Sequence, residues 1–305
     1  MADDAIDPNL QPAPREFPFE IDQSGNSAFP ILIAAPHGGK AYSEELVDNL
    51  RNCDALLRLE DRHVDLLARE IRALTGVSTI IATAPRALVD LNRAPDDVDW
   101  GMVAGLKLTR PRNSLANRRA RNGLGLIPRR LPGQGELWKR PLARAELDRR
   151  ISAIHAPYHA ALSRALMQIR DIWGAALLID LHSMPPLRKR HSDEVRADFV
   201  LGDRFGASCD GRLIAAALRY FGQQDRPIAH NRPYSGGYVL DRHGAPRAGI
   251  HAIQLEVCRS TYLDRRFDAT SPRLPAVARL LSGLMRTLAD ETAQIGGSAI
   301  SQAAE

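Results

Sequence analysis

Three apolar segments of the sequence end in, or just before, side chains that bind metals or transfer protons. His37 follows the run Ile31–Ala35, His182 follows the run 175–181, and Glu256 lies near the end of a third run. In open α/β sheets, functional sites gather outside the carboxyl ends of the strands. A catalytic zinc ion commonly takes two histidines and one carboxylate and keeps one position open for water. The pattern therefore indicates a metal site, although a histidine taken alone is more often a structural hydrogen-bonding residue.

The carboxylate of such a ligand set has two candidates. Glu60 and Asp61 stand at the beginning of the amphipathic segment 61–74, where an acidic residue also serves as an ordinary helix N-cap. The sequence leaves the metal and the capping interpretations open. Asp180 lies two residues before His182, on the same face of the strand, and we expect it to orient that histidine or to pair structurally.

Arginines in apolar surroundings form a second candidate group. Arg86 and Arg93 bracket a hydrophobic segment, so each needs an acidic partner or an anionic ligand. Asp90 lies between them and is expected to form a structural ion pair with one of the two. Arg259 presents the same choice. The stretch Tyr234-Ser235-Gly236-Gly237-Tyr238 is expected to be a loop that lets a substrate approach closely, or a plain turn.

The elements that must position these residues alternate between strands and helices. Apolar and β-branched runs predict strands at 31–35, 78–82, 87–91, 175–181, 199–202 and 251–257. Amphipathic periodicity predicts helices at 44–51, 61–74, 142–173 (divided at Pro157), 214–221 and 274–293. This order predicts an α/β protein, a three-layer sandwich in which helices flank a mixed, mostly parallel, twisted sheet. We expect an N-terminal arm at 1–27, one α/β domain at 28–295 and a disordered tail at 296–305.

Charge is distributed unevenly along the 305 residues. The net charge is +5, but residues 107–150 contain thirteen Lys or Arg against three acidic residues, a local charge of +10 that leaves −5 for the rest. Basic segments contact phosphates in nucleic-acid-binding proteins. This one contains a single aromatic residue and no helix-turn-helix, finger or RNP pattern. A solvated basic loop beside an anionic-substrate pocket is therefore favoured over nucleic-acid binding.

The cysteines and the N-terminus bear on the cellular compartment. Cys53, Cys209 and Cys258 are too far apart in sequence for a disulfide framework or a paired-cysteine metal site. The first residues lack the features of a signal peptide, and no apolar run approaches the ~20 residues that span a bilayer. These features predict a cytoplasmic protein without a membrane segment, and they do not indicate an oligomeric state.

Seven short motifs occur along the chain in a fixed order. They are Pro36-His37-Gly38-Gly39, Asp61 with Val64-Asp65, Asp90-Leu91-Asn92-Arg93, Leu137-Trp138 with Pro157-Tyr158-His159, Asp180-Leu181-His182-Ser183-Met184-Pro185, Tyr234-Ser235-Gly236-Gly237-Tyr238 and Gln254-Leu255-Glu256-Val257. No single motif is specific. The ordered set, from about residue 31 to residue 284, resembles the N-formylglutamate amidohydrolase family.

The resemblance implies a fold related to the zinc carboxypeptidases, with an eight-stranded mixed sheet between helices, and one zinc ion per chain. Carboxypeptidases place the ligand glutamate three residues after the first histidine, where this sequence has Lys40. The carboxylate must then come from elsewhere, and Asp61 is the best match, with Glu60 as the alternative. The expected roles are metal binding by His37, Asp61 and His182, proton transfer by Glu256, oxyanion support by Arg86, and substrate binding by Asn92, Arg93, Tyr234, Gly236, Gly237 and Arg259.

The expected activity is zinc-dependent hydrolysis of the N-formyl, or another N-acyl, amide of an acidic amino acid. For N-formyl-L-glutamate the products are formate and L-glutamate. This reaction belongs to amino-acid degradation, specifically to the degradation of histidine. The expected partner is thus a small anionic N-acyl amino acid. One alternative is a related zinc deacylase or carboxypeptidase-like peptidase with a different acyl substrate. The remote alternative is a non-enzymatic protein that binds nucleic acid through residues 107–150.

Overall fold

The computed structural model describes residues 17–23, 28–105, 118–188 and 195–303. Contacts between Cα atoms divide the chain into two compact units, each made of several segments. Unit 1 consists of Met1–Glu20, His37–Glu60 and Ala82–Tyr158, and unit 2 consists of Ile21–Pro36, Asp61–Ile81 and His159–Glu305. The expectation of one domain at 28–295 stays a prediction.

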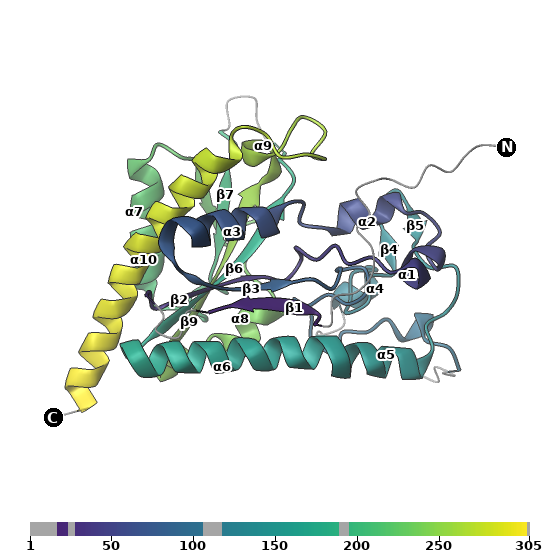
Figure 1. Ribbon diagram of the computed structural model, residues 1–305, viewed down its shortest axis with the longest axis horizontal. Coiled ribbons are helices and arrows are strands. Elements are labelled where there is room, and N and C mark those ends of the chain that lie inside the picture. Colours follow the sequence, from purple (N-terminus) through teal and green to yellow (C-terminus); the bar gives the residue numbers. More distant parts are fainter. Residues whose placement is uncertain (1–16, 24–27, 106–117, 189–194, 304–305) are drawn as a thin grey trace. The chain divides into compact units, whose positions relative to one another are not determined.

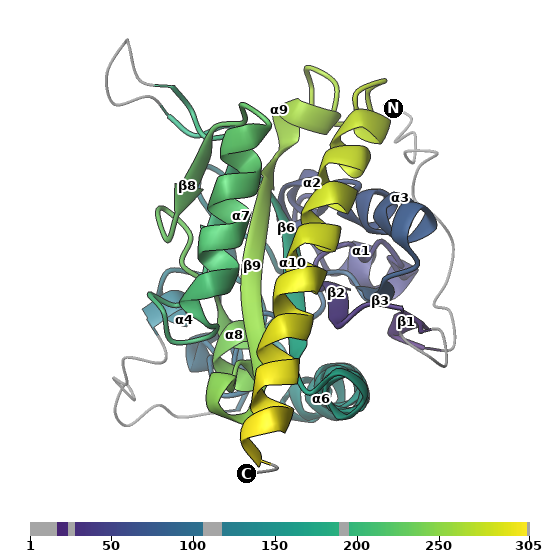
Figure 2. The same cartoon turned by 90° about the vertical axis from the view of Figure 1, so that its left-hand side faces the viewer.

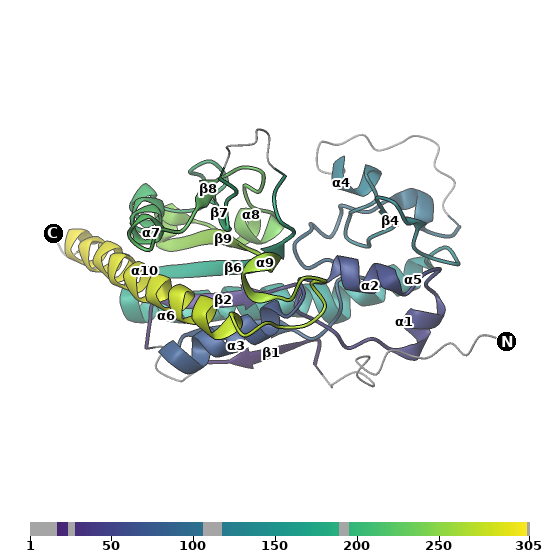
Figure 3. The ribbon, with the colours of Figure 1, turned by 90° about the horizontal axis from the view of Figure 1, so that it is seen from above.

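Unit 2 contains most of a seven-stranded sheet with the strand order β1-β3-β2-β6-β9-β7-β8. Figure 3 labels six of these strands, β1, β2, β6, β9, β7 and β8, in this order. The pairs β2–β3, β2–β6, β6–β9 and β7–β8 are parallel, and β7–β9 is antiparallel. The sheet is thus mixed and mostly parallel, as predicted, with seven strands in the described part of the chain in place of the expected eight. The strands are β1 (Phe19–Asp22), β2 (Ile31–Ala35), β3 (Ser78–Ala82), β6 (Ala176–Met184), β7 (Phe199–Gly202), β8 (Ile228–His230) and β9 (Ile250–Cys258).

The strands β2, β3, β6, β7 and β9 are buried along almost their whole length, so helices must cover both faces of this part of the sheet. The long helix α10 packs against α3 and α7, and Figures 1 and 2 show α10 beside α3 and across β9 from α7. Side chains from these three helices and from the strands form one apolar core. The helices of unit 2 are α3 (Val64–Thr75), most of α6 (Ala156–Trp173), α7 (Gly211–Gln223), α8 (Tyr238–His243), η4 (Pro246–Ala248), α9 (Arg259–Tyr262) and α10 (Leu274–Ala303).

The alternation of side chains along β6 and β9 separates the core from the polar site. Leu181 and Leu255 belong to the core beneath α3, α7 and α10. Asp180 and His182 occupy the alternate positions of β6, and Glu256 does so in β9, so they lie on the opposite face of the sheet. A shift of one residue in either strand would exchange these two sets of side chains.

Unit 1 contains short elements joined by turns. They are α1 (Glu44–Asp48), α2 (Asp54–Leu59), η1 (Trp100–Met102), α4 (Arg118–Arg121), the two-stranded pair β4 (Arg130–Leu131) and β5 (Gly135–Glu136), α5 (Arg144–Arg150) and the π-helical segment η3 (Ile151–His155). This segment and the start of α6 next to Pro157 divide the helix predicted at 142–173.

Several predicted boundaries are wrong, for identifiable reasons. Residues 87–91 form no strand. The Pro85 carbonyl accepts a hydrogen bond from the backbone amide of Leu88, and this turn redirects the chain. The helix predicted at 61–74 begins at Val64. At the C-terminus, α10 continues through residues 296–303, where a disordered tail was expected. Gly296 lies so close to the Trp173 carbonyl oxygen that a Cβ atom would meet it at 2.0 Å, so the glycine that weakens the helix also lets it pack.

Candidate metal centre and substrate site

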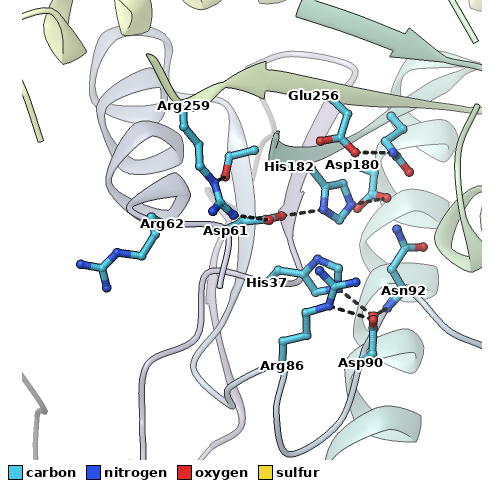
Figure 4. Close-up of polar contacts among 12 residues, drawn as sticks. His37, Asp61, Arg62, Arg86, Asp90, Asn92, Asp180, His182, Glu256 and Arg259 are labelled. Atoms are coloured by element: carbon cyan, nitrogen blue, oxygen red, sulfur yellow. Dashed lines mark hydrogen bonds and ion pairs between the residues drawn. The ribbon is translucent and has the colours of Figure 1, made fainter. Parts of the chain in front are cut away.

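His182 lies between two carboxylates. Its Nδ1 donates to Asp61 Oδ2 at 2.8 Å and its Nε2 donates to Asp180 Oδ2 at 2.9 Å, with all three side chains buried (Figure 4). Burial alone would lower the pKa of His182, but the charges of Asp180 and Asp61 overcome this and raise the pKa well above its usual value. The two carboxylates therefore create a buried position that favours positive charge.

Asp61, and not its neighbour Glu60, faces this histidine. The other Asp61 oxygen, Oδ1, lies 3.6 Å from the Arg259 guanidinium, whose Nε donates to Ser183 Oγ at 3.0 Å. Glu60 instead accepts a hydrogen bond from the hydroxyl of Tyr42. Neither acid caps α3, because that helix has His63 at its N-cap position and begins at Val64, so the capping interpretation is wrong.

His37 follows β2 by two residues, so this strand fixes where the histidine lies. Its Nε2 donates to Asp90 Oδ1 at 2.7 Å. Asp90 Oδ2 accepts a hydrogen bond from Arg86 Nε at 2.9 Å, and Oδ1 also accepts one from the backbone amide of Asn92. Burial alone would raise the pKa of Asp90, but Arg86, His37 and Arg93 hold it well below its usual range. The ionised Asp90 thus fixes the orientation of the His37 ring.

The three predicted ligands come together. One candidate ligand atom each from His37, Asp61 and His182 all lie within 4.8 Å of one another, and all three residues are buried. Each histidine has its Nε2 on a buried carboxylate, and His182 Nδ1 faces Asp61, itself a candidate ligand, so Nδ1 is the nitrogen of each ring that would ligate a metal. Two imidazoles and one carboxylate are a donor set that zinc accepts, so the residues fit this metal.

Glu256 lies beside His182 in the sheet. The two residues are direct partners in the parallel register of β6 and β9. Gln254 Nε2 donates to Glu256 Oε1 at 2.7 Å, and both side chains are buried. The sequence motif contains Gln254, but sequence reasoning assigned it no role. The alternation of side chains along a strand, which places residues 254 and 256 on one face, was the available signal.

The loop Tyr234–Tyr238 reaches the same part of the sheet. Gly202 is the register partner of Gln254, and a Cβ atom on Gly202 would lie 2.6 Å from the Ser235 carbonyl carbon. Gly236 has φ of +108°, a backbone conformation that side chains with a Cβ rarely adopt. Both glycines are therefore required for the close approach of this loop to β7, next to β9. This loop ends at Tyr238, where α8 begins.

The remaining predicted site residues, Arg86, Asn92 and Arg93, belong to unit 1 and surround Asp90. Asp90 forms the expected ion pair with Arg86, while its distance to Arg93 is 3.9 Å. Arg93 is buried and donates through Nε to the Leu124 carbonyl and through Nη1 to the Asn92 carbonyl. Sequence reasoning treated Asp90 only as an arginine partner and missed its bond to His37.

The basic segment 107–150 is partly neutralised by ion pairs. All three of its acidic residues, Glu136, Glu146 and Asp148, pair with arginines of the same segment. Residues 107–117 lie outside the described part of the chain. Among all the described residues of the chain, no helix is both long enough and apolar enough to cross a membrane.

Comparison with known proteins agrees with the motifs. A model of the N-formylglutamate amidohydrolase family matches residues 29–263. The N-formylglutamate deformylase of Pseudomonas putida is 33% identical over 266 residues, which cover 84% of this chain and 92% of that protein. The enzyme of the same name from Pseudomonas aeruginosa is 30% identical over the same coverage. The crystal structure of N-formylglutamate amidohydrolase from Ralstonia eutropha JMP134 has a TM-score of 0.79 at 30% identity and covers 90% of this chain and 98% of that chain. The chain therefore belongs to the N-formylglutamate amidohydrolase family, as its motifs predict.

Proposed function

We propose that this member of the N-formylglutamate amidohydrolase family is a zinc-dependent N-formylglutamate deformylase. The observation that carries the proposal is the buried group of His37, Asp61 and His182, of which His182 is the register partner of Glu256 in the sheet. The names of the Pseudomonas relatives supply the substrate, N-formyl-L-glutamate. The reaction adds water to the formyl carbon and breaks its bond to nitrogen, which gives formate and L-glutamate.

His37, Asp61 and His182 would hold one zinc ion per chain, through Nδ1 of each histidine and one oxygen of Asp61. When bound, zinc would polarise the formyl carbonyl and make water more acidic. Asp90 and Asp180 would keep the two histidine rings in their ligating orientation, because each accepts a hydrogen bond from the Nε2 atom of one ring.

Glu256 is the proposed general base and acid. Its carboxylate would accept a proton from the attacking water and then deliver it to the departing amino group of glutamate, so no net proton is consumed. The hydrogen bond from Gln254 engages Oε1. Arg86 is proposed to stabilise the negative charge that develops on the formyl oxygen.

The substrate carboxylates need cationic or polar partners. Asn92 and Arg93, which lie two and three residues after Asp90 in the sequence, are proposed to hold one substrate carboxylate. A planar guanidinium in a buried position binds a carboxylate well. Tyr234, Gly236 and Gly237 are proposed to border the substrate from the loop next to β7, and Arg259 to contribute positive charge. The Arg259–Asp61 distance of 3.6 Å places this guanidinium beside a proposed metal ligand.

The decisive experiment measures formate release together with metal content. Protein purified without a histidine tag should contain about one zinc per chain and release formate from N-formyl-L-glutamate. N-formyl-L-glutamine is the matched control substrate, because it has the same shape but lacks the side-chain charge, and it should react more slowly. Equal kcat/KM for both substrates would favour the alternative function, a related zinc deacylase with a different acyl substrate. Metal-free protein that binds nucleic acid in a salt-sensitive manner would contradict the enzyme assignment.

Two finer predictions accompany this function. A cytoplasmic location and a role in histidine degradation follow from the sequence and from the family resemblance. The relationship of the fold to zinc carboxypeptidases likewise stays a prediction, whereas the mixed α/β architecture is shared with the Ralstonia structure.

A further inference from the structure

We propose that Gln254 is a positioning residue that acts on catalysis through Glu256. The inference rests on the proposed role of Glu256 as the base. Gln254 Nε2 lies 2.7 Å from Glu256 Oε1, and the two residues are 5% and 7% exposed. A carboxylate has only lone pairs to offer, so the amide nitrogen of Gln254 must be the donor. The orientation of this amide group is therefore set by Glu256 itself.

The backbone keeps both side chains on one face of β9. Residues 254 and 256 are two apart in an extended strand, and β9 is held on both sides by neighbouring strands in this region. Asp180 and His182 of β6 are the register partners on one side, while Val200 and Gly202 of β7 are the partners on the other. A central strand paired on both edges moves little, so the amide donor stays at a fixed position relative to the carboxylate.

The consequence for Glu256 is a fixed orientation of its carboxylate. Oε1 is engaged by the amide, which fixes the rotation of the carboxylate relative to β9. A neutral donor can do this without the strong stabilisation of the ionised form that a guanidinium or ammonium group would bring.

A purely structural role for Gln254 makes a different prediction. Any buried glutamate needs a hydrogen-bond partner, and loss of that partner destabilises the fold. In that case a Gln254 variant would lower the melting temperature and would reduce activity only in proportion to the folded fraction. If Gln254 instead orients the base, its loss lowers kcat in the folded enzyme and has no effect once the base is absent.

The test is a double-mutant cycle with Gln254→Met and Glu256→Gln in the zinc-loaded full-length enzyme. Methionine has the length of glutamine and lacks the donor. Gln254→Met should lower kcat by roughly 10- to 100-fold, the range expected for one hydrogen bond to a charged group, with KM and zinc content unchanged. Glu256→Gln should lower kcat by roughly 10²- to 10⁴-fold. In the Glu256→Gln background, Gln254→Met should change kcat by less than about twofold, because no base is left to orient.

The matched control is Ser208→Ala. Ser208 is buried and donates to the Ala252 carbonyl at 2.7 Å. Ala252 belongs to β9, the strand of Gln254, but Ser208 has no proposed part in the site. Its replacement should lower the melting temperature and leave kcat unchanged. Equal fold-losses from Gln254→Met in both backgrounds, or loss of zinc from this variant, would overturn the positioning role and leave Glu256 as the base. Full turnover by Glu256→Gln would overturn the base assignment and the positioning role together.

Discussion

The buried histidine pair on α6 and α8 makes the stability of unit 2 dependent on pH. His243 ends α8, the helix that begins directly after the Tyr234–Gly237 segment, and its Nε2 lies 2.9 Å from Nδ1 of His159. Its Nδ1 lies 3.4 Å from Ser163 Oγ. Burial, with a smaller contribution from Arg242, lowers the pKa of His243 from 6.5 to about 4. The folded protein therefore keeps this ring neutral at mildly acidic pH.

The sign and size of the effect follow from proton linkage. Between pH 6.5 and pH 4 the unfolded chain holds a proton on residue 243 that the folded chain lacks, so the free energy of unfolding falls as the pH decreases. With the two pKa values above, the loss between pH 7.5 and pH 5 is about 2 kcal/mol, and it approaches about 3 kcal/mol below pH 4. The contribution is fully present above pH 6.5.

Urea unfolding of the chelator-treated protein at pH 7.5 and pH 5, followed by circular dichroism, measures this loss. His243→Gln keeps hydrogen-bonding atoms in the site but does not titrate, so it should lose about 2 kcal/mol less than wild type over this interval. Burial also lowers the pKa of His251, so this residue makes the free energy of unfolding fall with decreasing pH in both proteins. The comparison is therefore made between the two pH dependences. The same loss in both proteins would refute the buried neutral state of His243.

Three further predictions concern the site. His37→Ala and His182→Ala should each remove zinc and activity while the far-ultraviolet circular dichroism stays close to wild type, and stoichiometric zinc in either variant would contradict its role as a ligand. Asp61→Asn should weaken zinc binding in a chelator competition, whereas Glu60→Gln should leave it unchanged; the reverse order would make Glu60 the ligand. Arg93→Ala should lower kcat/KM by roughly 30- to 5,000-fold, with partial recovery in Arg93→Lys, and an unchanged kcat/KM would exclude a substrate contact.

The strands that carry the site were predictable because their burial is written in the sequence. The predicted runs 31–35, 78–82 and 199–202 match β2, β3 and β7, since a strand covered on both faces must be apolar throughout. β6 and β9 each continue beyond the predicted end. His182 therefore lies inside β6 and not after it, because the apolar run ends where the polar site residue begins although the backbone pairing continues. Glu256 lies inside β9, as the predicted run 251–257 implied.

The interactions that hold the ligands could not be predicted in the same way. Asp90 and His37 are separated by 53 positions in sequence, and the apolar segment around Asp90 is a turn and not the expected strand. Sequence patterns report local periodicity, whereas this contact depends on where the turn at Pro85 places residue 90 relative to His37. The ion pair with Arg86 was predictable because its partners are four residues apart.

The choice between Glu60 and Asp61 shows what a sequence of two adjacent acids leaves open. Glu60 ends α2 with an extended backbone, φ −65° and ψ 147°, and successive side chains of an extended backbone point in opposite directions. Only one of the two carboxylates can then face His182, and the other must find a different partner. Asp61 bonds the histidine and Glu60 accepts from Tyr42, so both buried acids are satisfied at once. The identity of the ligand therefore depends on where α2 ends, because in a helix that continued through both residues the two side chains would be about 100° apart around the axis and not on opposite sides of the chain.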